Sequence, residues 1–352
     1  LVMGFISYLS ARFHYPPLGN DFYPTTLFGA FALALSAIAS NPHRSGRKTA
    51  AGAGGIGAAL LIWLAAASRG EGWHSPSAWL PLFLGAALLL ACAWWIEPKA
   101  QNRKADAAID LWAGSAAVLA LVGVESAIPA EYRAAGHAAA ALLLAIGFAW
   151  RSWRVIGWAS LTAALLTLGH ALSPTLIGGT LAGQLPLWQA LLTLFGAAAL
   201  LFAGSTVVRR STDNVGAAEV LSAVAAVAAL VGVFVGLRWL ASGGAAVTLD
   251  GFTETSLRVL TLMAAGLILL PRIHEAPGPI GAWRGHVLLG LGLLYALMMP
   301  GLAINPWWGG PGRAVIDGMP LINTLTLAFA APAILAFVAA NRLYTRQIVF
   351  AR

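Results

Sequence analysis

The chain has 352 residues, of which 59% are hydrophobic and only 10% are charged, whereas about 25% of residues are charged in a typical soluble domain. Its mean hydropathy is +0.78, and a soluble fold needs more charge to cover its surface, so the composition excludes a soluble globular protein. The net charge of +8 would suggest nucleic acid in a soluble chain. Here the basic residues lie in short clusters between apolar runs, which indicates orientation in a membrane and no nucleic-acid partner.

Apolar runs follow one another along almost the whole chain. A spanning helix needs about 20 apolar residues to cross roughly 30 Å of hydrocarbon. We expect eleven spans, at residues 25–40, 49–68, 79–96, 107–124, 134–150, 155–171, 185–204, 215–237, 252–270, 285–299 and 319–340. The pattern predicts an all-α fold, a polytopic transmembrane helix bundle built from consecutive helical hairpins. We expect a single transmembrane helical domain over residues 1–352 and, since the chain begins at Leu1 rather than at methionine, a fragment of a longer polytopic protein.

The basic residues divide unequally between the two sides of this topology. One set of alternate connections carries 15 of them: Arg44, Arg47, Lys48, Lys99, Arg103, Lys104, Arg151, Arg154, Arg209, Arg210, Arg272, Arg284, Arg342, Arg346 and Arg352. The other set carries 5: Arg12, Arg69, Arg133, Arg238 and Arg313. Because positively charged connections stay in the cytoplasm, we expect the C-terminus inside. The tryptophans lie mostly near span ends, where an interfacial belt in contact with membrane lipids explains them.

No sequence motif predicts a cofactor or a metal. The stretch Gly52-Ala53-Gly54-Gly55-Ile56-Gly57 has the glycine spacing of the dinucleotide-binding fingerprint. It lacks the context of that motif, because no predicted strand precedes it and no acidic residue follows about 20 positions later. Small residues at the start of a helix let neighbouring helices approach closely, so we interpret these glycines as packing residues. The seven histidines show no metal-ligand spacing such as two His at i and i+4.

Polar residues inside the spans are the most informative ones, because burying them in lipid is costly. Asp110 and Glu219 fall near the predicted cytoplasmic ends. Six others fall in the outer part of the membrane: His137, His170, Gln189, Glu254, Arg258 and Asn323. Two interpretations stay open. These side chains either reach the interface from helix ends, or they line an outward-facing polar cavity.

Arg258 is the deepest of the six, roughly 9 Å into its helix at 1.5 Å per residue. Glu254 precedes it by four residues on the same face, in the favourable Glu-before-Arg order. We therefore expect an ion pair between them. Pro332, inside the last span, is expected to kink its helix. Neighbouring helices can satisfy the carbonyl that the proline frees.

A family resemblance appears near the C-terminus. The stretch Ser256–Leu262, which reads Ser-Leu-Arg-Val-Leu-Thr-Leu, resembles recurrent helices of a bacterial membrane family catalogued as domain of unknown function 2339 (DUF2339). The run from Gly318 through Asn323 to Pro332 resembles that family's closing pattern, and Asn305-Pro306-Trp307-Trp308 resembles its outer loop. The resemblance covers mainly residues 250–345. It implies a large polytopic protein of the bacterial inner membrane and supplies no activity, substrate or catalytic residue.

Three classes of function remain. The first is transport or lipid handling through an outward-facing polar cavity, since transporters place their sites at broken helices. The second is a structural or assembly scaffold of the cell envelope, for which helix packing suffices. The third is a membrane enzyme acting on a lipid-linked substrate at the outer face, with Asp21, Glu125 or Glu131 as its carboxylates. The outer connections are small, so an enzyme is the least favoured class. The sequence names no ligand and no protein partner.

Overall fold

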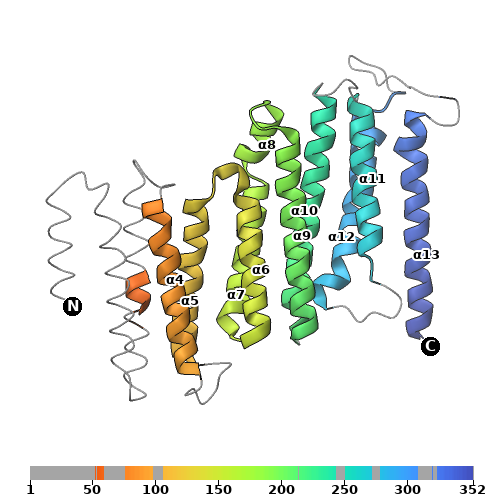
Figure 1. Cartoon of the computed structure of the whole chain (residues 1–352). Coiled ribbons are helices and arrows are strands. Elements are labelled where there is room, and N and C mark those ends of the chain that lie inside the picture. The colour runs from red at the N-terminus through yellow and green to blue at the C-terminus, as the bar shows by residue number, and fades with distance from the viewer. Residues whose placement is uncertain are drawn as a thin grey trace. The chain divides into compact units, whose positions relative to one another are not determined.

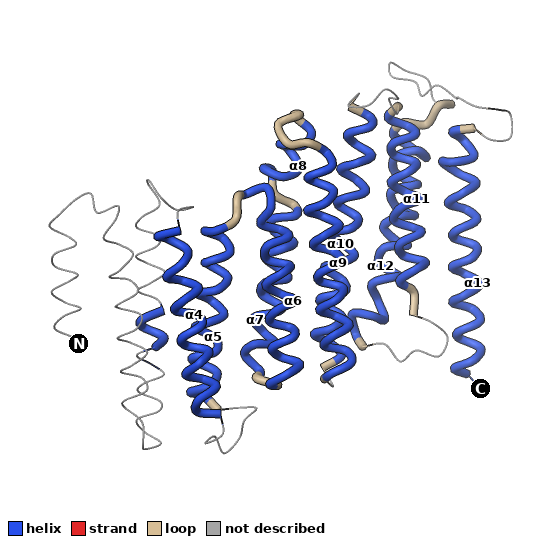
Figure 2. Tube along the Cα trace, in the orientation of Figure 1, coloured by secondary structure: helices blue, strands red, loops and turns tan. Residues whose placement is uncertain are grey.

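The computed structural model describes residues 52, 54–58, 76–97, 106–212, 214–242, 250–271, 278–307, 319 and 323–351. Within these ranges the chain is helical and forms no β-strand, which confirms the all-α prediction (Figures 1 and 2). Eight helical segments of the described part are long and apolar enough to cross a membrane: Ala107–Ala127, Ala130–Arg151, Arg154–Leu181, Leu187–Ser211, Val215–Ala241, Gly251–Leu269, Pro279–Ala303 and Thr326–Thr345.

The count of eleven spans is confirmed only in part. The eight segments correspond to the eight predicted spans from 107–124 onward. The predicted span 79–96 coincides with helix α4 (Pro76–Ile96), whose described apolar stretch Leu82–Trp95 is shorter. The predicted span 25–40 lies outside the described residues, as does 49–68 except for the helical residues 52 and 54–58.

The chain divides into two compact units, residues 1–170 with 203–213, and residues 171–202 with 214–352. A single domain over the whole chain stays a prediction. The elements in chain order are α4 (Pro76–Ile96), α5 (Ala107–Ala127), the 3-10 turn η2 (Ala130–Tyr132), α6 (Arg133–Arg151), α7 (Arg154–Ala171), α8 (Pro174–Leu181), α9 (Leu187–Ser211), α10 (Val215–Ala241), α11 (Gly251–Leu269), α12 (Pro279–Ala296), the π-helical segments η3 (Leu297–Ala303) and η4 (Thr326–Ala330), and α13 (Ala331–Ala351).

In the first unit, local signals set the helix ends. The Asp106 side chain caps α5 by accepting hydrogen bonds from the amides of Ala108 and Ile109, which otherwise have no partner in the helix. At the end of α6, Ser152 adopts a left-handed conformation with φ 57° and turns the chain directly into α7. A Cβ added at Gly54 would lie 2.8 Å from the Trp112 ring of α5. This close approach confirms the packing interpretation for that glycine.

In the second unit, α11 and α12 pack with their backbones in contact. A Cβ added at Gly266 would lie 2.7 Å from the amide nitrogen of Leu289, and one added at Gly285 would lie 2.7 Å from that of Leu270. Small residues allow this approach, as in other membrane helix pairs. Val259, Met263 and Leu289 form a buried core beside the contact, together with Ala339 of α13.

The structure shifts several predicted boundaries. The connection at Ser173-Pro174 contains the short helix α8, which Ser173 caps and Pro174 opens at its first turn, two recognised start signals. The segment predicted to end at residue 299 continues through Pro300 to Ala303 in the π-helical form. A second π-helical turn, η4, precedes Pro332 in the last span. Since proline lacks an amide hydrogen and its ring displaces the preceding carbonyl, a wider turn accommodates it.

Large apolar side chains also cover the outside of the helices. Leu143, Trp150, Ile268 and Phe337 are each at least two-thirds exposed in the isolated chain. A soluble protein rarely exposes so many large apolar groups on helices of this length. These surfaces therefore contact membrane lipid, as the composition predicts.

Candidate functional site

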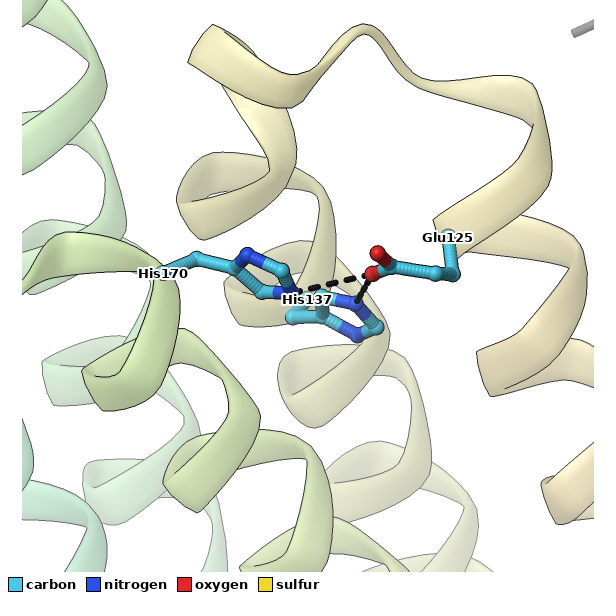
Figure 3. Close-up of side chains that lie close together, drawn as sticks. All are labelled: Glu125, His137 and His170. Carbon is cyan, nitrogen blue, oxygen red and sulfur yellow. Dashed lines mark hydrogen bonds and ion pairs between the residues drawn. The ribbon is translucent and has the colours of Figure 1, made fainter. Parts of the chain in front are cut away.

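Three ionisable side chains from three consecutive spans meet in the first unit (Figure 3). Nε2 of His137 lies 3.1 Å from Oε2 of Glu125, and Nε2 of His170 lies 2.9 Å from the same oxygen. Glu125 belongs to α5, His137 to α6 and His170 to α7. Two imidazole rings thus converge on one carboxylate oxygen.

The topology of α5, α6 and α7 places these residues at one end of the bundle. Glu125 lies in the last turn of α5, and His170 is one residue from the end of α7. The connection from Ile128 to Tyr132 is short, so it returns the chain immediately and puts His137 in the second turn of α6. Consecutive antiparallel helices with short connections pack as neighbours.

Arg133 holds the other side of the carboxylate. Its Nη1 lies 2.6 Å from Oε1 of Glu125, and its Nε donates a 3.1 Å hydrogen bond to the carbonyl of Ile128. The guanidinium therefore ties the α5–α6 connection to Glu125 and neutralises its charge. Because Arg133 occupies Oε1, the histidines share Oε2 alone.

The two rings are parallel, with 1° between their planes and 5.1 Å between their centroids. The side chain of His137 is 1% exposed, that of His170 21% and that of Glu125 30%. Nδ1 of His137 is buried without a hydrogen-bond partner. The one polar contact of this imidazole among the described residues is therefore the one it makes through Nε2 to Glu125, so the cluster is shielded on the His137 side and open on the other.

The arrangement can hold either a proton or a cation. One ligand atom from each of the three residues lies within 4.8 Å of the other two. With neutral imidazoles, the charges of Glu125 and Arg133 cancel, so the cluster adds no net charge to the membrane. Ionisable residues that gather inside spans in this way mark ion pathways and proton relays.

Glu254 and Arg258 form the ion pair that their four-residue spacing predicts, between Oε1 and Nη2. The structure adds a second partner, because Nη1 of Arg238 donates a 3.1 Å hydrogen bond to Oε2 of Glu254. Two guanidiniums thus share one carboxylate that is 6% exposed. Arg258 also lies over the ring of Phe234, 5.7 Å from its centroid, a favourable cation–π position.

Asn323 and Gln189 are the remaining predicted residues. Oδ1 of Asn323 accepts a 3.0 Å hydrogen bond from the amide of Thr326, so this side chain caps the start of the last helical segment. Gln189 is half-buried in the first turn of α9 and belongs to the second unit. The outward-facing cavity itself stays a prediction.

Two further carboxylates are buried at the ends of other spans. Glu97 accepts a 2.7 Å hydrogen bond from Arg151 and a 3.3 Å one from the indole of Trp153. Glu219 accepts hydrogen bonds from the amides of Gly278 and Ile280 at the start of α12. The favourable interaction of a carboxylate with a helix N-terminus accounts for the burial of Glu219.

Asp110, the other polar residue predicted near a cytoplasmic span end, lies half-buried in the first turn of α5.

Sequence reasoning missed Glu125 and Arg238 as members of these clusters. It ended the span of α5 at residue 124, whereas the helix runs to Ala127 and includes Glu125. The predicted span 215–237 likewise ended too early, because α10 runs to Ala241 and includes Arg238. The helical start signal at Asp106, followed by about 20 residues of apolar span, would have placed Glu125 inside the helix.

Comparison with known proteins agrees with a membrane protein of several spans. The family model described as "Predicted membrane protein (DUF2339)" matches residues 12–351. The match extends the resemblance seen at residues 250–345 to almost the whole chain. No curated protein and no solved structure matches the chain.

Proposed function

This chain belongs to the DUF2339 family of predicted membrane proteins, and we propose that it is a proton-linked transporter. Its site is the Glu125–His137–His170 cluster, at the outer end of α5, α6 and α7. Among the classes that the sequence leaves open, this is transport through an outward-facing polar site, with the proton as the transported ion.

One observation carries the proposal: two imidazoles of different spans, one buried and one partly buried, contact a single carboxylate oxygen. Each ionisable group inside a span is costly in lipid, so such groups are retained mainly where they pair or handle ions. A purely structural pair needs one cation for Glu125, and Arg133 already supplies it. The two histidines are therefore available for proton exchange.

The proposed orientation places this cluster toward the outside of the bacterial inner membrane, with the C-terminus in the cytoplasm. Its support is the unequal distribution of arginine and lysine, 15 against 5 between alternate connections, since positively charged connections stay in the cytoplasm. Arg151, Arg209 and Arg210 lie at the ends of α6 and α9, as this orientation requires.

Proton flux tests the proposal directly. The full-length protein is reconstituted into liposomes that contain a trapped pH-sensitive dye, and a valinomycin-set potassium gradient drives protons inward. We expect uptake faster than in empty liposomes, with most of the difference lost in Glu125→Gln. Glu131→Gln, six residues away in η2, is the matched control and should retain the flux. A wild-type rate equal to that of empty liposomes, or an unchanged rate in Glu125→Gln, would reject the proposal.

Lipid handling is the second candidate, favoured by the cluster of the second unit. Arg238 and Arg258 share Glu254, so one positive charge is left over, which suits a lipid phosphate. The same liposomes can carry a fluorescent phospholipid whose quenching by dithionite measures movement between leaflets. Rapid movement that Arg238→Gln abolishes, without proton flux, would favour this candidate over the first.

An envelope scaffold is the third candidate, favoured by the backbone contact between α11 and α12 at Gly266 and Gly285. A protein that serves only as a scaffold would show neither proton flux nor lipid movement. The enzyme alternative has less support, because Glu125 makes ion-pair contacts through both oxygens and Asp21 lies outside the described residues.

A further inference from the structure

We infer that the Glu125–His137–His170 cluster is a binding site for a divalent transition metal ion, with zinc as the best fit. This inference rests on the proposed function, because it names the ion that the same site would carry. Such a site requires ligand atoms of the right kind, at the right separations and with an accessible side.

The donor set favours zinc over the common alkaline-earth ions. Two imidazole nitrogens and one carboxylate oxygen are ligands that zinc binds well. Calcium takes six to eight oxygen ligands, and magnesium prefers oxygen ligands in an octahedron. Since two of the three donors here are nitrogens, a hard oxygen-seeking cation is disfavoured.

Two of the three separations between the ligand atoms are close to those that zinc requires. Zinc lies about 2.0–2.1 Å from nitrogen and about 2.0–2.2 Å from oxygen, so ligand atoms around a tetrahedral ion are about 3.3 Å apart. The two Nε2–Oε2 distances are 3.1 Å and 2.9 Å. The ligand nitrogens of the two rings lie within 4.8 Å of each other, and the two rings are parallel, so the rings would have to turn and approach each other to complete three corners of a tetrahedron.

The surroundings supply orientation and access. Arg133 holds Oε1 and so leaves Oε2 directed at the two rings, as groups behind metal ligands commonly do. Its positive charge also opposes a divalent cation, which favours reversible binding of the kind that transport needs. The exposed parts of Glu125 and His170 leave the fourth position of a tetrahedron to water.

Zinc binding to the full-length protein in lipid nanodiscs tests the inference. The protein is treated with EDTA, freed of chelator, titrated with zinc chloride and then measured for bound metal after desalting. We expect one zinc per chain at this site, with affinity at least tenfold lower in Glu125→Gln and in His170→Gln. The control is His286→Gln, because His286 lies in α12 and contacts its own Ala282 carbonyl. It should bind zinc as the wild type does.

Cobalt provides a spectroscopic signature that would be absent if the Glu125–His137–His170 cluster only stabilised the fold. Co²⁺ bound by these residues should show the intense visible bands of four-coordinate cobalt, and these should vanish in His170→Asn. His170 is the more exposed histidine, so this variant should fold even if a change at His137 does not. Zinc binding that is absent, or equally strong in Glu125→Gln, His170→Gln and wild type, would overturn the inference.

The two proposals fail in different ways. Proton flux that depends on Glu125, without zinc binding, removes the metal inference and leaves the proton-linked transporter. Zinc binding that depends on Glu125 and His170, without proton flux, supports the metal site and rejects the transport mechanism.

Discussion

The backbone amide of Gly278 donates a 2.7 Å hydrogen bond to Oε1 of Glu219, which lies 59 residues earlier in the chain. The amide of Ile280 donates to the other oxygen at 3.2 Å. Glu219 is 1% exposed. Gly278, the N-cap residue of α12, has no side chain that could cap the helix, so the carboxylate of Glu219 caps it. A charge on α10 thereby holds the start of α12.

Replacing Glu219 tests this link. Glu219→Leu leaves two amides without their acceptor, so we expect the free energy of unfolding to fall by about 2 kcal/mol or more. Glu219→Gln keeps an acceptor and loses the interaction of the charge with the helix N-terminus, so a loss of about 1 kcal/mol is expected. Thermal unfolding of the detergent-solubilised protein measures both. Equal stability of Glu219→Leu and wild type would show that the link does not matter.

The contact between α11 and α12 predicts opposite effects for two glycines of the same helix. In Gly285→Ala, the new Cβ would lie 2.7 Å from the amide nitrogen of Leu270, so the backbones must separate, with an expected loss of about 1–3 kcal/mol. Nothing lies within 4 Å of a Cβ at Gly290. Gly290→Ala should therefore gain up to about 1 kcal/mol from helix propensity. Unfolding experiments that rank the two variants the other way would contradict this packing.

The Arg238–Glu254–Arg258 cluster predicts unequal effects for replacing its members. With Arg258 as its one partner, Glu254 would be stranded by Arg258→Leu. Since Arg238 also contacts Glu254, we expect Arg258→Leu to be mild. Glu254→Leu should cost about 2 kcal/mol, because it leaves the partly buried Arg258 without its acceptor, whereas Arg238 is 55% exposed and can turn to solvent.

A double-mutant cycle checks this cluster. Glu254→Leu with Arg258→Leu should be less unstable than the sum of the single changes. The control is Arg238→Leu with Arg258→Leu, which strands Glu254 and should be as unstable as Glu254→Leu alone. Strict additivity of the Glu254 and Arg258 changes would show that the two side chains do not interact.

The proposed orientation predicts which introduced cysteines a membrane-impermeant thiol reagent can reach. In a Cys92→Ala background, a cysteine at Gly310 should react in intact cells. A cysteine at Thr212, directly after α9, should react only after the membrane is opened. Cys92 is a free cysteine that packs as a small apolar residue, so its replacement by alanine should be tolerated. Reaction at 212 and protection at 310 in intact cells would reverse the topology.

Several features of the fold follow from sequence alone because they depend on local properties. A run of about 20 apolar residues is long enough to cross the membrane whatever its neighbours are, so the eight candidate spans of the described residues were predictable. The Glu254–Arg258 pair was equally predictable, since residues four apart share a helix face. Boundaries moved by several residues where polar groups such as Glu125 and Arg238 continue a helix.

The tertiary structure alone decided which polar residues meet. Glu125, His137 and His170 are separated by 12 and 33 residues, and their contact depends on how each helix is rotated about its axis. In a soluble protein, an apolar stripe reveals that rotation. Helices such as α5, α7 and α10 are apolar on all sides, because lipid and protein neighbours are equally apolar. The sequence by itself therefore determined how many times the described chain can cross the membrane, whereas only helix packing brought two histidines and one glutamate together.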